Sequence, residues 1–262
     1  MILALHGLAI SATLMAVGWC ISLARRDVGV VDALWGPAIA ATGVAYVVAG
    51  AAVSARGRLA VVLAVIWALR LAAHVLYRNH GKPEDRRYRE IRARNEPGFA
   101  WKSLYLVFGL QAVLAWIVGL PLYGAATAAG APGMLDVFGV LLWVFGLTFE
   151  SVADYQLVRF QGGSAAERGV MDRGLWRYSR HPNYFGEFCL WWGLWLIAAA
   201  GGAWWTVIGP ALLTFFLLKV SGVALTEQDI AGRRPDYQAY MRRTSAFFPR
   251  PAPRYPAREP DR

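Results

Sequence analysis

The residues best suited to chemistry in this 262-residue chain gather in one stretch, RYSRHPNYFGE, from Arg177 to Glu187. Pro182 suits the first turn of a helix, where its missing N–H costs nothing, and His181 precedes it at a capping position. A helix start offers free N–H groups and a positive dipole end, which favour an anion such as a pyrophosphate. An alternative is that the arginines only bind lipid headgroups. The residues predicted to bind an anionic cofactor here are Arg173, Tyr178, Arg180, His181, Asn183, Tyr184 and Glu187.

Two acidic residues, Glu150 and Asp154 in FESVADYQ, are four positions apart and therefore share one helix face. Two carboxylates on one face repel unless a cation or a hydrogen-bond donor lies between them. We expect them to accept hydrogen bonds from a ligand's amide and hydroxyl groups, or from the arginines of the next loop. The alternative is that they face water at the end of the helix.

A second polar group lies in WALRLAAHVLYRNHGKP, where Arg70 and His74 are also four residues apart. Trp67 lies one turn before Arg70, and Lys82 lies just beyond the helix end. If they turn inward, Arg70 offers a phosphate two parallel hydrogen bonds from its guanidinium, and Lys82 offers it a compact ammonium charge. Arg70 near a helix end also has the option of extending to the headgroups.

Asp32 and the C-terminal segment complete the candidate groups. Asp32 lies near the start of an apolar run, and an apolar setting favours the protonated form that a proton donor at neutral pH needs. In TEQDIAGRRPDYQAYMRRTSAFFP, Glu227 begins a polar stretch whose Tyr237 and Tyr240 are placed to stack on a nucleotide. A solvated amphipathic helix explains this stretch equally well.

The elements that position these residues are apolar. Hydrophobic residues make up 57% of the chain and mean hydropathy is +0.37, which leaves too little polar surface for a water-soluble globule. The 27 Lys and Arg are confined to short segments between apolar runs, which argues against nucleic acid. Cys20 and Cys189 lie in apolar runs without metal spacing, so neither a disulfide framework nor a metal site is expected.

We therefore predict an all-α integral membrane protein with seven transmembrane helices, each near the length needed to cross the hydrocarbon core. Clustered Lys and Arg between spans three and four, between five and six, and in the tail place the N-terminus outside and the C-terminus in the cytoplasm. Arg56 and Arg58 fall on the opposite side. The predicted spans are roughly 2 to 24, 29 to 52, 59 to 77, 103 to 125, 133 to 155, 182 to 200 and 204 to 225.

The chain has no linker long enough to separate domains. Residues 1–248 form one predicted domain, with a cofactor-binding half at about 133–248. The Pro-rich, charged tail 249–262 is predicted to be disordered.

The order GLWRYSRHPNYFGE, apolar span, TEQDIAGRRPDYQAYMRRTSAFFP resembles the C-terminal half of the steroid 5-alpha-reductase family, in particular its bacterial branch. It also resembles, more distantly, isoprenylcysteine carboxyl methyltransferases and sterol C14 and delta-7 reductases. The resemblance covers about 110 residues from Phe149 onward, and less closely the region from Trp67 to Pro83.

This resemblance implies a seven-helix membrane enzyme that binds NADPH in a cytoplasm-facing cavity and reduces an activated C=C bond of a lipid. The family's Asn-x-x-x-Asp falls on Glu150 and Asp154, and its Asn-aromatic-x-Gly-Glu falls on the segment from Asn183 to Glu187. Its Tyr-x-x-Arg falls on Trp67 to Arg70. Trp67 thus replaces a substrate-contacting tyrosine, and the family's Gln-Glu pair has no clear counterpart.

The resulting expectation is hydride transfer from NADPH to the beta carbon of a steroid-like or other lipid enone that enters from the bilayer of the bacterial inner membrane. Asp32, assisted by Trp67 or His74, is the expected partner of the developing enolate. The first rival is an S-adenosylmethionine-dependent methyltransferase of lipids or prenylated thiols. The second is a non-enzymatic lipid-binding or transport bundle, which gives the clustered polar groups no task.

Overall fold

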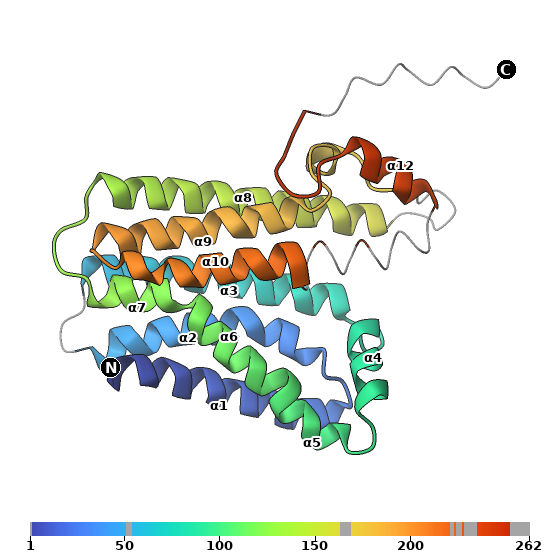
Figure 1. The fold of residues 1–262 in the computed structure, drawn as a ribbon, viewed down its shortest axis with the longest axis horizontal. Helices are drawn as coiled ribbons and strands as arrows, with labels where there is room; N and C mark the ends of the chain where they lie inside the picture. The colour runs from blue at the N-terminus through green and yellow to red at the C-terminus, as the bar shows by residue number, and fades with distance from the viewer. Residues whose placement is uncertain are drawn as a thin grey trace. The chain divides into compact units, whose positions relative to one another are not determined.

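The computed structural model describes residues 2–50, 54–162, 169–220, Val223, Glu227 and 235–251 (Figure 1). Over these residues the regular elements are helices, and the lone β contact is a bridge between Ser179 and Ser245. The predicted tail lies outside this description from residue 252 onward. The helices are α1 Ile2–Arg25, α2 Val30–Ala49, α3 Ala55–Asn79, α4 Arg86–Asn95, α5 Phe99–Ser103, α6 Leu110–Val118, α7 Leu120–Thr127, α8 Met134–Gln161, α9 Pro182–Ala200, α10 Ile208–Phe215 and α12 Pro235–Arg243.

Five of the described helical segments are long and apolar enough to cross a membrane: 2–25, 30–49, 55–79, 99–127 and 134–161. They correspond to the first five predicted spans, so the all-α membrane character is confirmed. The fourth runs through α5, a π-helical segment, α6 and α7, with a turn at Gly119 between the last two. The sixth predicted span is α9, whose first two turns carry Asn183 and Glu187, and the seventh is represented in the described residues by the shorter apolar helix 204–220.

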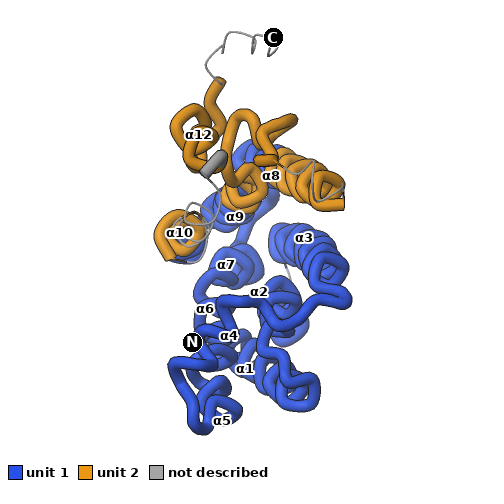
Figure 2. The backbone as a smooth tube through the Cα atoms, turned by 90° about the vertical axis from the view of Figure 1, so that its right-hand side faces the viewer, with its two compact units in different colours: residues 1–143, 191–213 blue, residues 144–190, 214–262 orange. Residues whose placement is uncertain are grey.

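The chain divides into two compact units, which Figure 2 distinguishes by colour. Unit 1 holds residues 1–143 and 191–213, and unit 2 holds 144–190 and 214–262. Within unit 1, α2 packs between α1 and α3, and α6 and α7 lie against these three helices. Unit 1 therefore has a helical core of its own.

Helix α1 shows how these helices pack. Its buried residues are Gly7, Ser11, Met15, Gly18 and Ser22, which follow one another at intervals of three or four and so form one face. Small residues let backbones approach closely, which is how helices associate in a lipid environment. The other faces expose large apolar side chains such as Ile2 and Val17, as expected of residues in contact with lipid.

Helices α8 and α9 also approach each other closely at glycines. In unit 1, a Cβ at Gly139 would lie 2.7 Å from the carbonyl oxygen of Gly193. In unit 2, a Cβ at Gly186 would lie 2.5 Å from the backbone nitrogen of Glu150. Neither position has room for a side chain, so these glycines fix how closely the two helices pack.

An ion pair between Arg56 and Asp136 lies in unit 1, near the start of α3. Both side chains are at most 3% exposed, with Arg56 Nε 2.7 Å from Asp136 Oδ1. The guanidinium also donates to the carbonyl oxygens of Ala129 and Ala131, which anchors the turn before α8 on the start of α3. The charge of Arg56 is therefore compensated inside unit 1.

Helix α4 was not predicted, because it is charged throughout and carries no apolar repeat. Its start is nevertheless specified locally: the Asp85 carboxylate accepts a hydrogen bond of 2.8 Å from the backbone N–H of Arg87. An aspartate at the N-cap is a readable signal for a helix start. The helix places Arg87 and Tyr88 against Asp32, and Arg92 against Glu84.

The Arg56→Met variant should be strongly destabilised, by about 3–5 kcal/mol, because it leaves the Asp136 carboxylate buried without its cation. The double variant Arg56→Met/Asp136→Leu should recover most of that loss, since no uncompensated charge remains. Unfolding free energies in mixed micelles measure both. Exposed Arg58 provides the matched control, and Arg58→Met should change stability by less than about 0.5 kcal/mol. Wild-type stability of Arg56→Met would contradict this account of the ion pair.

Candidate functional site

The centre of the candidate site lies in unit 2, where α9 begins against α8. Since Gly186 contacts the backbone at Glu150, Asn183 is placed one turn before this contact. Its Nδ2 atom donates to Asp154 Oδ1 at 3.1 Å. Glu150 and Asp154 are buried, with exposures of 3% and 5%. The structure therefore brings together the two carboxylates and the asparagine that were predicted to bind a cofactor.

The other end of the Asn183 amide is left without a hydrogen bond. Its Oδ1 atom is buried and has no hydrogen-bond partner among the described residues. A buried carbonyl oxygen without a donor costs about 1–3 kcal/mol. Such an oxygen suits a ligand that brings an N–H group, and the carboxamide of nicotinamide is one such ligand.

Arg180 and His181 converge on Glu227. The Arg180 guanidinium forms a two-point ion pair with Glu227, with Nε–Oε1 at 2.7 Å and Nη2–Oε2 at 2.9 Å. Its Nη1 atom donates to the carbonyl oxygens of Met241 and Thr244. The His181 Nε2 atom lies 3.1 Å from Glu227 Oε1. Arg180 thus ties the start of α9 to the C-terminal segment, a structural role that the sequence did not reveal.

The charge state of Glu227 follows from these contacts. Burial acts to raise the pKa of Glu227, but hydrogen bonds from His181 and Arg180, together with the charge of Arg180, hold it below its ordinary value. The carboxylate is therefore kept ionised as the centre of the cluster. The His181 ring in turn stacks on Tyr184, with ring centroids 5.3 Å apart.

The predicted nucleotide-stacking tyrosines lie on α12 and face inward. Tyr240 is 1% exposed, and its hydroxyl donates to the carbonyl oxygen of Trp176. Tyr237 is 7% exposed, and burial raises its pKa to about 12. Both rings pack within unit 2, where the two tyrosines act as buried residues of α12.

Cations at the surface of this cluster come from the turn before α9. Arg173, Arg177 and Tyr178 are exposed, in and beside the single helical turn Gly174–Arg177. Neither Arg173 nor Arg177 has a side-chain partner in the part of the chain that the structure describes. The turn itself is held by a hydrogen bond from Trp176 Nε1 to the carbonyl oxygen of Ala153 on α8. Glu187 lies one turn after Asn183 and is half-buried.

The remaining predicted residues lie in unit 1. The setting of Asp32 differs from the prediction: its carboxylate accepts hydrogen bonds from Arg87 Nη2 at 2.9 Å and from the Tyr88 hydroxyl at 2.5 Å. The expectation of an apolar environment is therefore wrong. Burial, followed by the charge of Asp32, raises the pKa of Tyr88 well above its ordinary value. Arg87 and Tyr88 were missed because they lie on the charged helix α4, whose sequence carries no apolar repeat that would predict its contacts.

Trp67 is fully buried in unit 1 and packs edge to face on Trp191, with ring centroids 5.1 Å apart. Both indole nitrogens lack a hydrogen-bond partner among the described residues. Arg70 and His74 are half-buried farther along α3. Lys82 is exposed beyond its end, beside a surface pocket.

The described residues hold no cluster of metal-ligating side chains. Within the described ranges, no group of three or more His, Cys, Asp or Glu side chains is placed to hold a metal ion. The polar clusters consist instead of arginine, carboxylate, amide and aromatic groups. Such groups suit an organic anion with hydrogen-bonding substituents.

These observations define the chain as a helical membrane protein with buried polar clusters. It belongs to the family described as protein of unknown function DUF1295, whose family model matches residues 18–244. The uncharacterized protein C594.04c of Schizosaccharomyces pombe is 25% identical over 279 aligned residues, which cover 93% of this chain and 79% of the yeast protein. No solved structure matches the chain.

The Glu227→Gln variant tests the electrostatic cluster. At neutral pH it should be destabilised by about 3 kcal/mol, because Arg180 then stays buried without its anion. Since the folded-state pKa of Glu227 is lowered, its contribution is complete above the ordinary value of 4.5 and is lost as the pH falls through the folded-state value. The stability difference between wild type and variant should therefore shrink on acidification.

Unfolding free energies measured over a pH series check this expectation. Glu90→Gln is the matched control, since Glu90 forms an exposed ion pair with Arg86 and should change stability little. A Glu227→Gln penalty that does not change with pH would contradict the role of the carboxylate charge.

Proposed function

We propose that the protein is a membrane-embedded, NADPH-dependent reductase that acts on an activated C=C bond of a lipid, such as the enone of a steroid-like compound. The proposal rests on the resemblance of RYSRHPNYFGE and the C-terminal segment to the steroid 5-alpha-reductase family, together with the geometry of unit 2. The observation that carries it is the Asn183 amide, whose nitrogen is held by Asp154 while its oxygen is buried without a donor.

The residues of unit 2 fit a dinucleotide in two respects. Asn183 Oδ1 is available to accept from the nicotinamide carboxamide, with Glu150, Asp154 and Glu187 nearby on α8 and α9 as further acceptors. Arg173 and Arg177, exposed at the turn before α9, are suited to the phosphate groups. An arginine-rich site also favours the 2′-phosphate that distinguishes NADPH from NADH.

Some of the predicted cofactor ligands take supporting roles in this proposal. The donors of Arg180 are engaged by Glu227 and by backbone carbonyls, so Arg180 positions the start of α9 rather than contacting phosphate. Glu227, His181, Tyr184, Tyr237 and Tyr240 build the same support. Arg70 and Lys82 remain predicted phosphate ligands from unit 1.

The chemistry supplied by bound NADPH is a hydride, which adds to the beta carbon of the enone while the alpha carbon takes a proton. The protein must stabilise the negative charge that develops on the enone oxygen. Trp67 suits this role because its indole N–H is buried without an acceptor among the described residues. Asp32 and His74 remain the predicted acid groups, with Tyr88 now joined to Asp32 by a hydrogen bond.

The proposal includes seven spans, an outer N-terminus and a cytoplasmic C-terminus. The distribution of positive charge supports this orientation, with Arg56 and Arg58 as the exceptions. A cytoplasmic site gives NADPH access from water, while a lipid substrate enters from the bilayer, which in a bacterial cell would be the inner membrane.

The Asn183→Ala variant should bind NADPH about five- to tenfold more weakly than wild type, because it removes one hydrogen-bond acceptor for the carboxamide. Calorimetry on the detergent-solubilised protein measures the affinity. Asn95→Ala is the matched control, since the Asn95 amide donates to the Ile91 carbonyl of its own helix, and this variant should bind NADPH normally. Binding of S-adenosylmethionine instead of NADPH would favour the methyltransferase, and binding of neither would exclude both enzymes.

The Trp67→Phe variant separates catalysis from folding. It keeps the ring and removes the N–H, so stability should be unchanged or higher while the rate of reduction falls by about 100-fold or more. Transfer of deuterium from C4-labelled NADPH into a membrane lipid extract, followed by mass spectrometry, measures the rate. Trp143→Phe removes another buried indole N–H without a partner among the described residues and should leave the rate unchanged. Equal rates in the two variants would remove Trp67 from the mechanism.

A further inference from the structure

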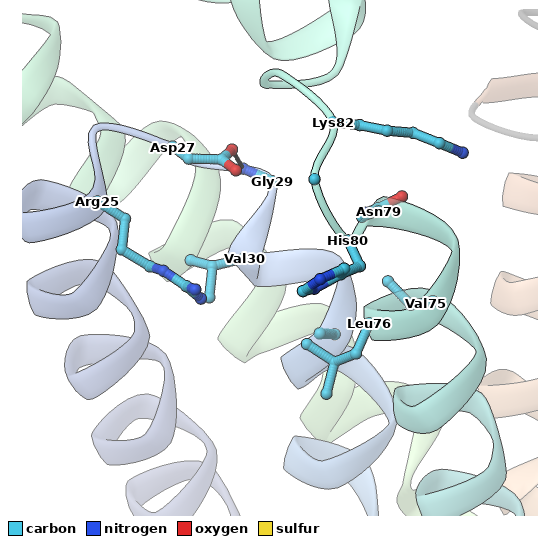
Figure 3. Close-up of a pocket in the computed structure, with 11 residues that line it drawn as sticks. Arg25, Asp27, Gly29, Val30, Val75, Leu76, Asn79, His80 and Lys82 are labelled. Carbon is cyan, nitrogen blue, oxygen red and sulfur yellow. Dashed lines mark hydrogen bonds between the residues drawn. The ribbon is translucent and has the colours of Figure 1, made fainter.

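A surface pocket lies in unit 1, at the end where α1 and α3 terminate. Its cavity volume is about 280 Å³, near the lower limit for small-molecule sites and too small for a whole dinucleotide. The end of α1, the start of α2 and the end of α3 form its walls (Figure 3). The lining residues are Arg25, Asp27, Gly29, Val30, Ala33, Val75, Leu76, Asn79, His80, Gly81 and Lys82.

The polar groups of this pocket suit an anion. Figure 3 shows the side chains of Arg25 and His80 directed toward Val30 from opposite walls, whereas Lys82 extends away. Within the described ranges, the Arg25 and His80 side chains have no hydrogen-bond or ion-pair partner. The one carboxylate of the lining, Asp27, accepts a hydrogen bond of 2.8 Å from the backbone N–H of Gly29. An arginine and a histidine are thus available to a phosphate group.

The walls are held in place by Glu84. Its carboxylate accepts a hydrogen bond of 2.9 Å from the backbone N–H of Val28, in the turn between α1 and α2. It also forms an ion pair with Arg92 of α4 at 2.8 Å. The loop after α3 is thereby attached to the turn that carries the opposite wall.

The apolar part of the pocket continues onto the outer face of α3. A second hollow shares Leu76 and His80 with the first and adds Tyr77. Leu76 and Tyr77 are 56% and 70% exposed, and Leu69, farther along α3, is 65% exposed. Because α3 is long and apolar enough to cross a membrane, this face is suited to an acyl chain. A charged hollow beside an apolar one matches a headgroup and its chain.

We propose that this pocket binds the phosphate group of an anionic membrane phospholipid, with Arg25 and His80 on the phosphate and Leu76 and Tyr77 against an acyl chain. Basic pockets at the membrane interface recognise such headgroups. The site goes beyond the proposed reductase activity and does not depend on it. Lipid binding here would fix the α1–α2 turn and the loop after α3.

Native mass spectrometry of the full-length protein with equal amounts of phosphatidylglycerol and phosphatidylcholine tests the proposal. Wild type should retain phosphatidylglycerol preferentially. In the Arg25→Gln/His80→Gln variant, the ratio of retained phosphatidylglycerol to retained phosphatidylcholine should fall about fivefold or more. Both residues are exposed, so the variant should fold, and thermal unfolding in the same detergent checks this. Arg26→Gln/Arg78→Gln changes exposed cations that do not line the pocket and should keep the preference.

Four results would overturn the proposal. Equal losses in both double variants would show diffuse attraction to surface charge, and equal retention of the two lipids by wild type would show no headgroup selection. Displacement of phosphatidylglycerol by excess inorganic phosphate would identify a free anion as the ligand. Retained binding of phosphatidylglycerol in Arg25→Gln/His80→Gln, at the wild-type preference, would place the lipid elsewhere. NADPH affinity should be the same in all these variants.

Discussion

The close approach of Gly186 to the backbone of Glu150 is the contact on which the candidate site depends. A side chain at this position would lie 2.5 Å from a backbone nitrogen, so only glycine lets α9 start this near to α8. Asn183, one turn earlier, then reaches Asp154, and the buried carboxylates face an amide. In the sequence NYFGE, Gly186 therefore allows the two helices to approach, and this approach lets Asn183 reach Asp154.

The cluster around Glu227 supports this arrangement from the other side. Ion pairs that bury a charge contribute little to stability by themselves, but removing one partner is costly, so they hold a segment in one arrangement. Arg180, directly before His181, forms an ion pair with Glu227 and donates to the carbonyl oxygens of Met241 and Thr244. Ser179 Oγ donates to the carbonyl oxygen of Phe247. The start of α9 is thus fixed by a segment that is distant in sequence. Arg56 and Asp136 act in the same way in unit 1.

The sequence predicted those features that depend on local pattern. Helix α9 begins at Pro182 and ends at Ala200, as proline in the first turn and the apolar run indicated. Spacing by four residues placed Glu150 and Asp154 on one buried face. The partners of Asp32 and Arg180 were not predictable, because Arg87 and Glu227 lie 55 and 47 residues away in the chain. An arginine that binds phosphate and an arginine that forms a structural ion pair look the same in a sequence. Only the contacts in the structure distinguish them.

Hydrogen exchange followed by mass spectrometry, with and without NADPH, tests the central claim most directly, since it locates the cofactor without knowledge of the substrate. NADPH should slow amide exchange in the segment from Arg173 to Glu187 and around Glu150 and Asp154, while S-adenosylmethionine should leave both unchanged. Exchange that is unaffected by NADPH in these segments, or slowed there by S-adenosylmethionine alone, would contradict the proposed cofactor site.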